Sequence, residues 1–265
     1  MDSSKPDIMK KHDMTFRLTV ALVLLGNIIY CKTLFSQTTT IQIMTNDKVA
    51  VTADLYTPNP ASAPFIILFH QATYSRGEYL DIAPKLNAMG FNCMAVDLRS
   101  GESVNGVENK TWRWADSLGM PTRFIDAYTD MRAALSYVKR KYPGSKIILF
   151  GSSYSASLAI KLASDFPEGI SGVVAFSPAE YFSKFGWSRD IIQTSASRIK
   201  CSVFITSGRD EQERWQKIYD AIPVKGKVSF LPQASGQHGA KALWPTFPEN
   251  TEYWAALKNY LSRFK

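Results

Sequence analysis

The segment Gly151-Ser152-Ser153-Tyr154-Ser155 lies between an apolar run, Lys146–Phe150, and a helical pattern over Ser155–Phe166. A strand-to-helix turn this short strains the backbone of its central residue and aims that side chain out above the sheet. Small residues are needed two positions before and after the centre because strand and helix nearly touch, and Gly151 and Ser155 meet that need. The turn therefore indicates a nucleophilic Ser153. A serine-rich helix cap without catalysis is the alternative.

The chain around this turn alternates apolar runs with helical patterns from residue 40 onward, which is typical of strands joined by crossover helices. Ile41–Met44 and Val49–Tyr56 alternate apolar and polar residues, which predicts an antiparallel hairpin of edge strands turned at Asn46-Asp47. Continuous apolar runs predict a parallel sheet covered on both faces at Phe65–Phe69, Asn92–Val96, Lys146–Phe150, Gly172–Phe176, Ser202–Thr206 and Lys227–Leu231. Helices are expected at Glu78–Met89, Arg123–Lys141, Ser155–Phe166, Glu211–Ile222 and Thr251–Phe264.

A serine hydroxyl needs a base to take its proton, and the sequence contains three histidines. His12 lies near the amino terminus, and His70 directly follows a predicted strand, where a structural role is expected. His238 follows the last predicted strand in a loop with Gly236 and Gly239, at the same edge of the sheet as Ser153. His238 is therefore the expected base, and a solvated loop histidine is the alternative.

The acid that orients the base is expected just past the strand Ser202–Thr206. Asp210 lies there, and the resulting order Ser153, Asp210, His238 is the one expected for this sheet topology. Glu211 and Glu180 are alternatives for the same role, and Asp210 could instead simply cap the next helix.

Two backbone N–H groups should stabilise the negative charge that develops on a substrate oxygen. Tyr154 N–H, at the start of a helix, is the first candidate. The second should come from the loop after the strand Phe65–Phe69, with Ala72 preferred and Gln71 next.

Residues 38–265 resemble the α/β-hydrolase superfamily, in particular its dienelactone-hydrolase-like and serine-esterase branch. The resemblance lies in His70-Gln71-Ala72, Asp97-Leu98-Arg99-Ser100-Gly101, Gly151-Ser152-Ser153-Tyr154-Ser155, Gly208-Arg209-Asp210 and His238-Gly239. It implies a three-layer fold with an eight-stranded, mostly parallel sheet and helices on both faces. It also implies a Ser-acid-His triad with a backbone oxyanion hole and no cofactor. Dienelactone hydrolases proper use a cysteine nucleophile where this chain has Ser153, so their substrate is not carried over.

The strand order that the resemblance implies places the strand of Cys93 four positions from the strand beside Cys201, about 19 Å at 4.8 Å per step. A disulfide tolerates only about 7 Å between Cα atoms. We therefore expect both thiols to be free and buried.

The substrate pocket must be built from loops, since no insertion is long enough for a lid domain. Aromatic residues of these loops could line a compact apolar cleft: Tyr74, Trp112, Trp114, Phe182 and Trp187. Arg99 and Arg209 could hold a substrate carboxylate, although arginines at strand ends more often brace loops.

Residues 1–36 are expected to form a cleaved secretory signal, followed by one domain over 38–265. Lys10, Lys11 and Arg17 precede the apolar run Leu18–Tyr30, which as a helix would rise only about 20 Å, short of the roughly 30 Å hydrocarbon slab. No stable membrane span is expected, although a retained anchor remains an alternative. The predicted location is periplasmic or extracellular.

Composition argues against other classes of protein. Hydrophobic residues make up 45% of the 265 residues, enough to bury a large core. The net charge of +8 is spread along the chain and no Cys/His cluster occurs, so neither nucleic-acid binding nor a metal site is expected.

The sequence therefore predicts a serine hydrolase that cleaves a carboxylic ester or related acyl bond of a small substrate through an acyl-enzyme on Ser153. Peptide, thioester and lactone substrates are alternatives on the same triad. A non-catalytic protein that uses the cleft only for binding is the alternative from another class.

Overall fold

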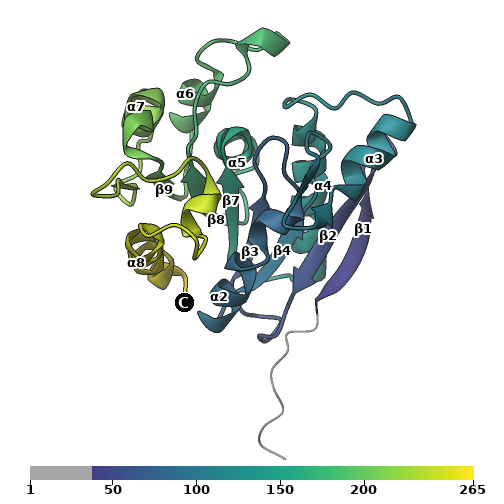
Figure 1. Cartoon of the computed structure of the whole chain (residues 1–265), viewed down its shortest axis with the longest axis horizontal. Coiled ribbons are helices and arrows are strands. Elements are labelled where there is room, and N and C mark those ends of the chain that lie inside the picture. The colour runs from purple at the N-terminus through teal and green to yellow at the C-terminus, as the bar shows by residue number, and fades with distance from the viewer. Residues whose placement is uncertain (1–37) are drawn as a thin grey trace, which may run out of the picture. The chain divides into compact units, whose positions relative to one another are not determined.

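The computed structural model of the chain describes residues 38–265 (Figure 1). The predicted signal segment lies outside the described residues. Within them, no helix is both long enough and apolar enough to cross a membrane.

An eight-stranded sheet in the order β1-β2-β4-β3-β7-β8-β9-β10 forms the centre of the fold. Its strands are β1 (Thr39–Met44), β2 (Ala50–Tyr56), β3 (Phe65–Phe69), β4 (Asn92–Val96), β7 (Ile147–Ser152), β8 (Ile170–Phe176), β9 (Ser202–Thr206) and β10 (Val228–Phe230). The strands β3, β4 and β7 to β10 are parallel, whereas β2 is antiparallel to both β1 and β4. The predicted eight-stranded, mostly parallel sheet is confirmed.

Alternate side chains of the same strands face two separate cores, because successive residues of a strand point to opposite faces. On β3, Phe65, Ile67 and Phe69 pack in one core, and Ile66 and Leu68 pack in the other. Each residue of β3 is therefore buried, which explains the continuous apolar run.

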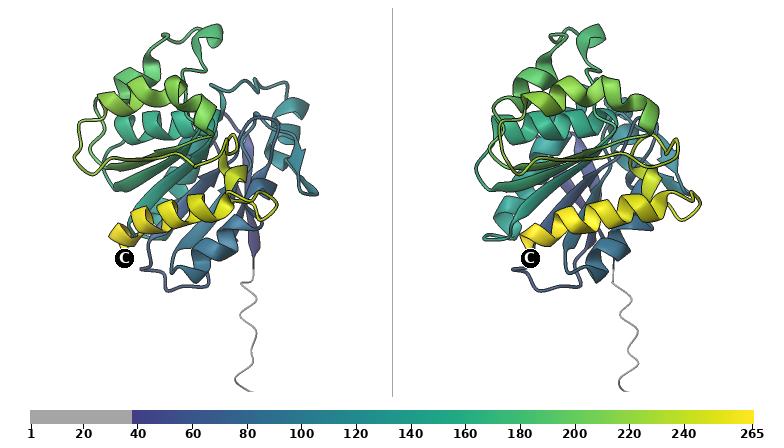
Figure 2. Two further views of the ribbon diagram at one scale, coloured as in Figure 1. Left: turned by 60° about the vertical axis from the view of Figure 1, so that its left-hand side comes forward. Right: turned by 90° about the vertical axis from the view of Figure 1, so that its left-hand side faces the viewer.

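Helices cover both faces. The helices α4 (Ala127–Lys141), α5 (Tyr154–Asp165), α6 (Ile191–Ala196) and α7 (Gln212–Ala221) contribute to the first core, and α2 (Ile82–Ala88) and α8 (Asn250–Leu261) contribute to the second. Figure 2 shows α8 on one side of the strands and α5 and α7 on the other. The predicted three-layer α/β architecture is confirmed.

Several elements differ from the expectation. The hairpin β1–β2 forms, but β2 also pairs with β4, so only β1 and β10 are edges. The predicted helix over 78–89 is divided into a 3₁₀ turn, η1 (Arg76–Tyr79), and α2. The region Ser100–Thr122, for which the sequence predicts neither strand nor helix, contains a small two-stranded sheet, β5 (Ser103–Val104) and β6 (Val107–Glu108), followed by α3 (Lys110–Ser117).

The two cysteines of the described chain are free, as expected. Three strands, β3, β7 and β8, separate β4, which carries Cys93, from β9. Cys93 is buried, but Cys201 directly precedes β9 and is only partly buried, which corrects the expectation for that residue.

The register of the sheet brings the loops that carry the candidate catalytic residues to one edge, at the carboxyl ends of the parallel strands. Phe69 at the end of β3 pairs with Gly151 of β7, and Ser152 of β7 pairs with Phe176 of β8. The loops that follow β3, β7, β8 and β9 therefore begin side by side at the carboxyl ends of their strands, the usual position of ligand sites in such sheets.

Candidate active site

The turn between β7 and α5 has the strained conformation that the sequence predicts. Ser153 has φ 59° and ψ −124°, a region that non-glycine residues rarely adopt. Its N–H donates to Phe176 O over 2.7 Å, which holds the turn against β8. A Cβ on Gly151 would lie 2.4 Å from Ala156 Cα, so only glycine fits at this position.

Ser155 takes the place of the second glycine that such turns often have. Its buried hydroxyl accepts Ser152 N–H over 2.9 Å and lies 2.8 Å from Phe69 O, to which it can donate. The side chain thus ties the turn to β3 as well as fitting the narrow space.

His238 meets Ser153 from the loop that follows β10. The imidazole Nε2 lies 2.8 Å from Ser153 Oγ, within hydrogen-bond distance. Ser153 is nearly buried, while His238 is half-buried. The two residues that the sequence nominates as nucleophile and base are therefore in contact.

The carboxylate beside His238 belongs to Glu211, and the expectation of Asp210 at this position is wrong. His238 Nδ1 contacts Glu211 Oε1 in a short hydrogen bond. Both acidic residues lie in the 3₁₀ turn η3 (Arg209–Glu211), where successive side chains point about 120° apart. Glu211 points inward and is buried, and Asp210 is exposed to solvent.

Glu180, the other alternative for the acid, has a different role. Its carboxylate accepts Ile192 N–H over 3.0 Å and Gln193 N–H over 2.7 Å, so it caps the start of α6.

The second carboxylate oxygen of Glu211, Oε2, also accepts hydrogen bonds. Ser177 Oγ donates to Glu211 Oε2 over 2.7 Å, and Gly208 N–H donates to the same atom over 3.3 Å. Burial on its own would raise the pKa of Glu211, but the hydrogen bonds from His238 and Ser177 outweigh burial, and the pKa lies below its ordinary value of 4.5. Glu211 is therefore ionised at neutral pH.

The two backbone N–H groups that the sequence nominates for an oxyanion hole, Tyr154 N–H and Ala72 N–H, are both unpaired within residues 38–265. Tyr154 is the first residue of α5, where the helix dipole also favours negative charge. Gln71, the second candidate for the β3 loop, is not available, since its N–H donates to Glu78 Oε2 over 2.8 Å.

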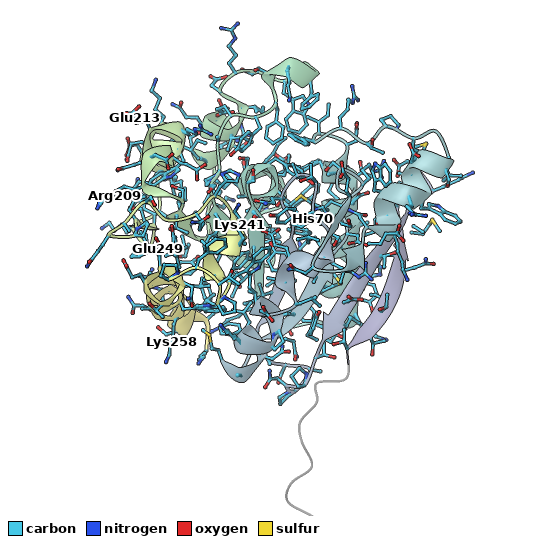
Figure 3. The ribbon with its side chains drawn as sticks, viewed as in Figure 1. His70, Arg209, Glu213, Lys241, Glu249 and Lys258 are labelled. Atoms are coloured by element: carbon cyan, nitrogen blue, oxygen red, sulfur yellow. The ribbon has the colours of Figure 1, made fainter. Side chains whose placement is uncertain are left out.

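His70 has the structural role that the sequence suggests. Nδ1–H donates to Gln71 O over 2.7 Å, and Nε2 accepts Leu98 N–H over 2.8 Å, which identifies the neutral tautomer. Complete burial lowers the pKa of His70 to about 4. Figure 3 shows His70 in the interior of the molecule. The imidazole thus joins the loop after β3 to the loop after β4.

The family comparison agrees with this geometry. Residues 60–216, more than half of the chain, match the family model described as "Serine aminopeptidase, S33". The chain belongs to this α/β-hydrolase family. No curated protein sequence matches the hydrolase.

Solved structures share the fold of the hydrolase. A dienelactone hydrolase from Anabaena variabilis is 12% identical with a TM-score of 0.67, over 86% of this chain and 98% of that one. The Pyrococcus furiosus esterase Pf2001 is 20% identical with a TM-score of 0.63, over 86% and 90% of the two chains. Est1E from Butyrivibrio proteoclasticus, solved with bound ferulic acid, is 13% identical with a TM-score of 0.65, over 84% and 98%.

A cavity of about 320 Å³ lies beside the loop that follows β3 in the hydrolase. Its walls include Ala72 and Thr73 from that loop and three aromatic residues, Trp112, Phe124 and Phe185. Phe124 stacks on the Tyr154 ring at 4.5 Å and meets Phe185 edge-on at 5.6 Å. A larger hollow of about 510 Å³ lies at the opposite ends of β7 and β8, away from Ser153.

Only Trp112 of the five predicted pocket residues lines this cavity. Phe182 is completely buried in the core, and Trp187 packs against it at 5.2 Å. Tyr74 stacks on Trp244 at 6.0 Å, and Trp114 is 46% exposed on α3. The prediction missed Phe124 because it lies in a segment that was expected to be helical.

The two arginines considered for a substrate carboxylate do not serve that purpose. Arg99 is buried and ion-paired with Asp130 and Asp47, at 2.7 and 2.6 Å, so its charge is already balanced. Arg209 is exposed and lies at the outer edge of the molecule in Figure 3. Among the residues that the structure describes, no cluster of side chains could hold a metal ion.

Proposed function

We propose that this hydrolase cleaves small carboxylic esters through an acyl-enzyme formed on Ser153. The observation that carries the proposal is the continuous contact from Ser153 Oγ to His238 to the ionised Glu211. In this arrangement, the base can take the serine proton and the carboxylate stabilises the resulting imidazolium.

The reaction follows from the positions of these groups. Ser153 Oγ attacks the ester carbonyl carbon while its proton passes to His238 Nε2, and the carbonyl oxygen becomes an oxyanion facing Tyr154 N–H and Ala72 N–H. His238 then gives the proton to the departing alkoxide, which leaves as the alcohol. A water molecule activated by His238 next attacks the acyl carbon, and the carboxylic acid leaves as Ser153 regains its proton.

The cavity beside Ala72 favours a compact acyl group with an aromatic or short aliphatic body. Its aromatic walls offer apolar contact, and its volume of about 320 Å³ limits the length of the chain.

Peptidase activity is a second candidate, because the matching family model describes serine aminopeptidases. An aminopeptidase must receive a cationic amino terminus. The cavity contains one carboxylate, Glu102, against two cations, Arg123 and Lys184, although Asp126 already pairs with Arg123. With Arg123 paired, Lys184 balances Glu102, so the cavity offers an ammonium group no net negative charge.

A fluorophosphonate probe and a panel of aryl esters of graded acyl length test the proposal. The wild-type protein should label and hydrolyse the shorter esters, and Ser153→Ala should do neither. Replacing Ser153 or His238 should lower turnover roughly a millionfold. A wild-type protein that neither labels nor turns over would support the alternative, a hydrolase fold used only for binding.

Export is proposed from residues 1–36 alone, where basic residues precede the apolar run Leu18–Tyr30. Expression of the whole chain with a carboxyl-terminal tag in a bacterial host, followed by amino-terminal sequencing of the exported fraction, tests both export and cleavage. Retention of the intact chain in the membrane fraction would support an uncleaved anchor instead.

A further inference from the structure

Glu78 is a completely buried acidic residue beside the candidate oxyanion hole, in the 3₁₀ turn η1. The triad does not use it, and within residues 38–265 no cation pairs with its carboxylate. Since burying a carboxyl group is costly unless it is hydrogen-bonded, its contacts indicate what it contributes.

The Glu78 carboxyl joins three loops of the site. Oε2 accepts Gln71 N–H over 2.8 Å, and Oε1 accepts the Ser152 hydroxyl proton over 2.7 Å. Ser152 Oγ in turn accepts Ala240 N–H over 2.8 Å. Gln71 directly precedes the oxyanion donor Ala72, Ser152 precedes the nucleophile, and Ala240 lies two residues after His238.

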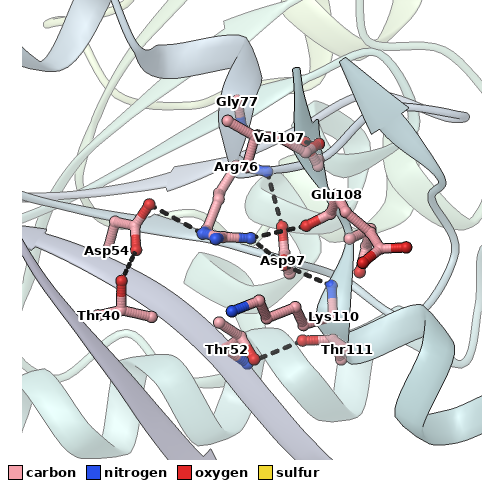
Figure 4. Close-up of polar contacts among 12 residues, drawn as sticks. Thr40, Thr52, Asp54, Arg76, Gly77, Asp97, Val107, Glu108, Lys110 and Thr111 are labelled. Carbon is pink, nitrogen blue, oxygen red and sulfur yellow. Dashed lines mark hydrogen bonds and ion pairs between the residues drawn. The ribbon is translucent and has the colours of Figure 1, made fainter. Parts of the chain in front are cut away.

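The turn that carries Glu78 is fixed from its other side by Arg76. The guanidinium donates to Asp54 over 2.8 Å and to Asp97 over 2.7 Å, and Arg76 N–H donates to Asp97 over 2.8 Å (Figure 4). Arg76 and Asp97 are buried, so this network attaches η1 to β2 and β4. Glu78 therefore projects from a rigid support and cannot easily turn toward solvent.

The protonation state of Glu78 decides which contacts are possible. Burial raises its pKa to about 7, while the hydrogen bonds from Ser152 and Gln71 and the charge of Lys241 act in the opposite direction. Lys241 comes from the 3₁₀ turn η4 (Ala240–Leu243) and is labelled in Figure 3. The other titratable groups that face the carboxyl are three phenols, Tyr74, Tyr79 and Tyr154.

We propose that Glu78 is a positioning residue whose ionised carboxylate, by accepting Gln71 N–H and the Ser152 hydroxyl together, holds Ala72 N–H in place opposite Ser153. This inference rests on the proposed function, since it assigns Glu78 a task in the oxyanion hole. The ionised form accepts from both partners. The protonated form has a donor on one oxygen, so one of the two contacts must be lost or reversed.

The site already contains an acceptor for a Ser152 hydroxyl that turns away from protonated Glu78. Gln71 Oε1 is buried and has no hydrogen-bond partner within residues 38–265. A Cβ built on Gly239 would lie 2.4 Å from Gln71 Oε1 and 2.7 Å from Ser152 Oγ, so both atoms border the same space. Protonation thus shifts hydrogen bonds around Gln71, the residue that precedes the oxyanion donor.

Glu78→Gln tests the proposal, because the amide has the size of the carboxyl and, like the protonated acid, carries a donor at one end. With an aryl ester substrate, we expect kcat to fall 10- to 100-fold and KM to change less than threefold, since an oxyanion contact acts in the transition state. The acid limb of log(kcat/KM) should be steeper in the wild type than in the variant, because only the wild type loses the Glu78 carboxylate as pH falls.

Tyr79→Phe is the matched control. It removes the hydrogen bond from Tyr79, a buried residue of the same turn, to Phe69 O and leaves Gln71 unaltered, so its acid limb should be as steep as that of the wild type. Ser152→Ala provides a second test that does not depend on Glu78→Gln folding, and its kcat should fall at least fivefold.

The proposal is overturned if folded Glu78→Gln keeps a kcat within twofold of the wild type, or loses activity while its acid limb keeps the wild-type slope. Should that variant not fold, a Ser152→Ala enzyme within twofold of the wild type overturns it. Failure of the proposed function looks different, because the wild-type protein would then react with the fluorophosphonate no faster than Ser153→Ala.

Discussion

Ser177 Oγ donates to Glu211 Oε2 over 2.7 Å and also accepts Gly239 N–H over 2.9 Å. One hydroxyl therefore connects the acid of the candidate triad to the residue that follows His238. Ser177 has φ 56°, a second strained non-glycine residue at the site, and it directly follows β8. Such strain persists only where surrounding contacts hold it.

Ser177→Ala should lower kcat about tenfold. The variant removes a hydrogen bond to a charged group, worth about 1.5 kcal/mol, and leaves Glu211 freer to turn away from His238. Steady-state kinetics on an aryl ester measure the effect, and Ser197→Ala, on an exposed residue outside the site, is the control. Unchanged kinetics in a folded Ser177→Ala protein would show that Glu211 is held well enough by its other contacts.

Replacement of the two neighbouring acids should separate their roles. Glu211→Gln should reduce kcat about ten-thousandfold because the imidazolium loses its charged partner and the amide can favour the wrong tautomer. Asp210→Asn, at an exposed position, should keep nearly full activity. If instead Asp210→Asn were the inactive variant, the turn η3 would have to rearrange in the active enzyme.

His70→Gln should change how stability depends on pH. The folded-state pKa of His70 is depressed from 6.5 to about 4. The stability that neutral His70 contributes to the fold is therefore complete above pH 6.5 and is lost as pH falls toward 4. The free energy of unfolding should fall by about 3 kcal/mol over this range, at 1.36 kcal/mol per pKa unit.

Chemical unfolding of both proteins at several pH values measures this contribution. The stability difference between the wild type and His70→Gln should be greatest above pH 6.5 and should shrink by about that amount at pH 4. A difference that stays constant over this range would mean that the imidazole takes up a proton without leaving its two hydrogen bonds.

Trp112→Ala should extend the range of acyl groups. The indole lines the cavity beside the loop that follows β3, so its removal makes room for a longer chain. Each added methylene that becomes buried is worth about 0.8 kcal/mol, or roughly fourfold in kcat/KM. The optimum in an aryl ester series should move to longer acyl chains.

Trp114→Ala, two residues further along the same helix and largely exposed, is the matched control and should keep the wild-type optimum. A Trp112→Ala enzyme whose chain-length profile matches the wild type would place acyl binding elsewhere.

Local pattern was enough to predict the framework of the fold. The apolar runs at Phe65–Phe69, Asn92–Val96 and Ser202–Thr206 match β3, β4 and β9 residue for residue, because strands buried on both faces are mostly apolar. The turn at Ser153 was visible because a strand-to-helix junction this tight restricts the residue types on both sides. By contrast, α3 and α6 are only eight and six residues long, too short for the spacing of apolar residues to indicate a helix.

The amino-acid sequence alone determined which hydroxyl and which imidazole are available, since both follow from strand ends and from the scarcity of histidine. Only the tertiary structure decided between Asp210 and Glu211, because the direction of adjacent side chains in a single 3₁₀ turn depends on how that turn is packed. It also showed that the Glu78 carboxyl is buried, because residues distant in sequence remove water from around it. The spacing of apolar residues along the sequence indicates which positions are buried. The direction and solvation of a single side chain result from contacts across the whole fold.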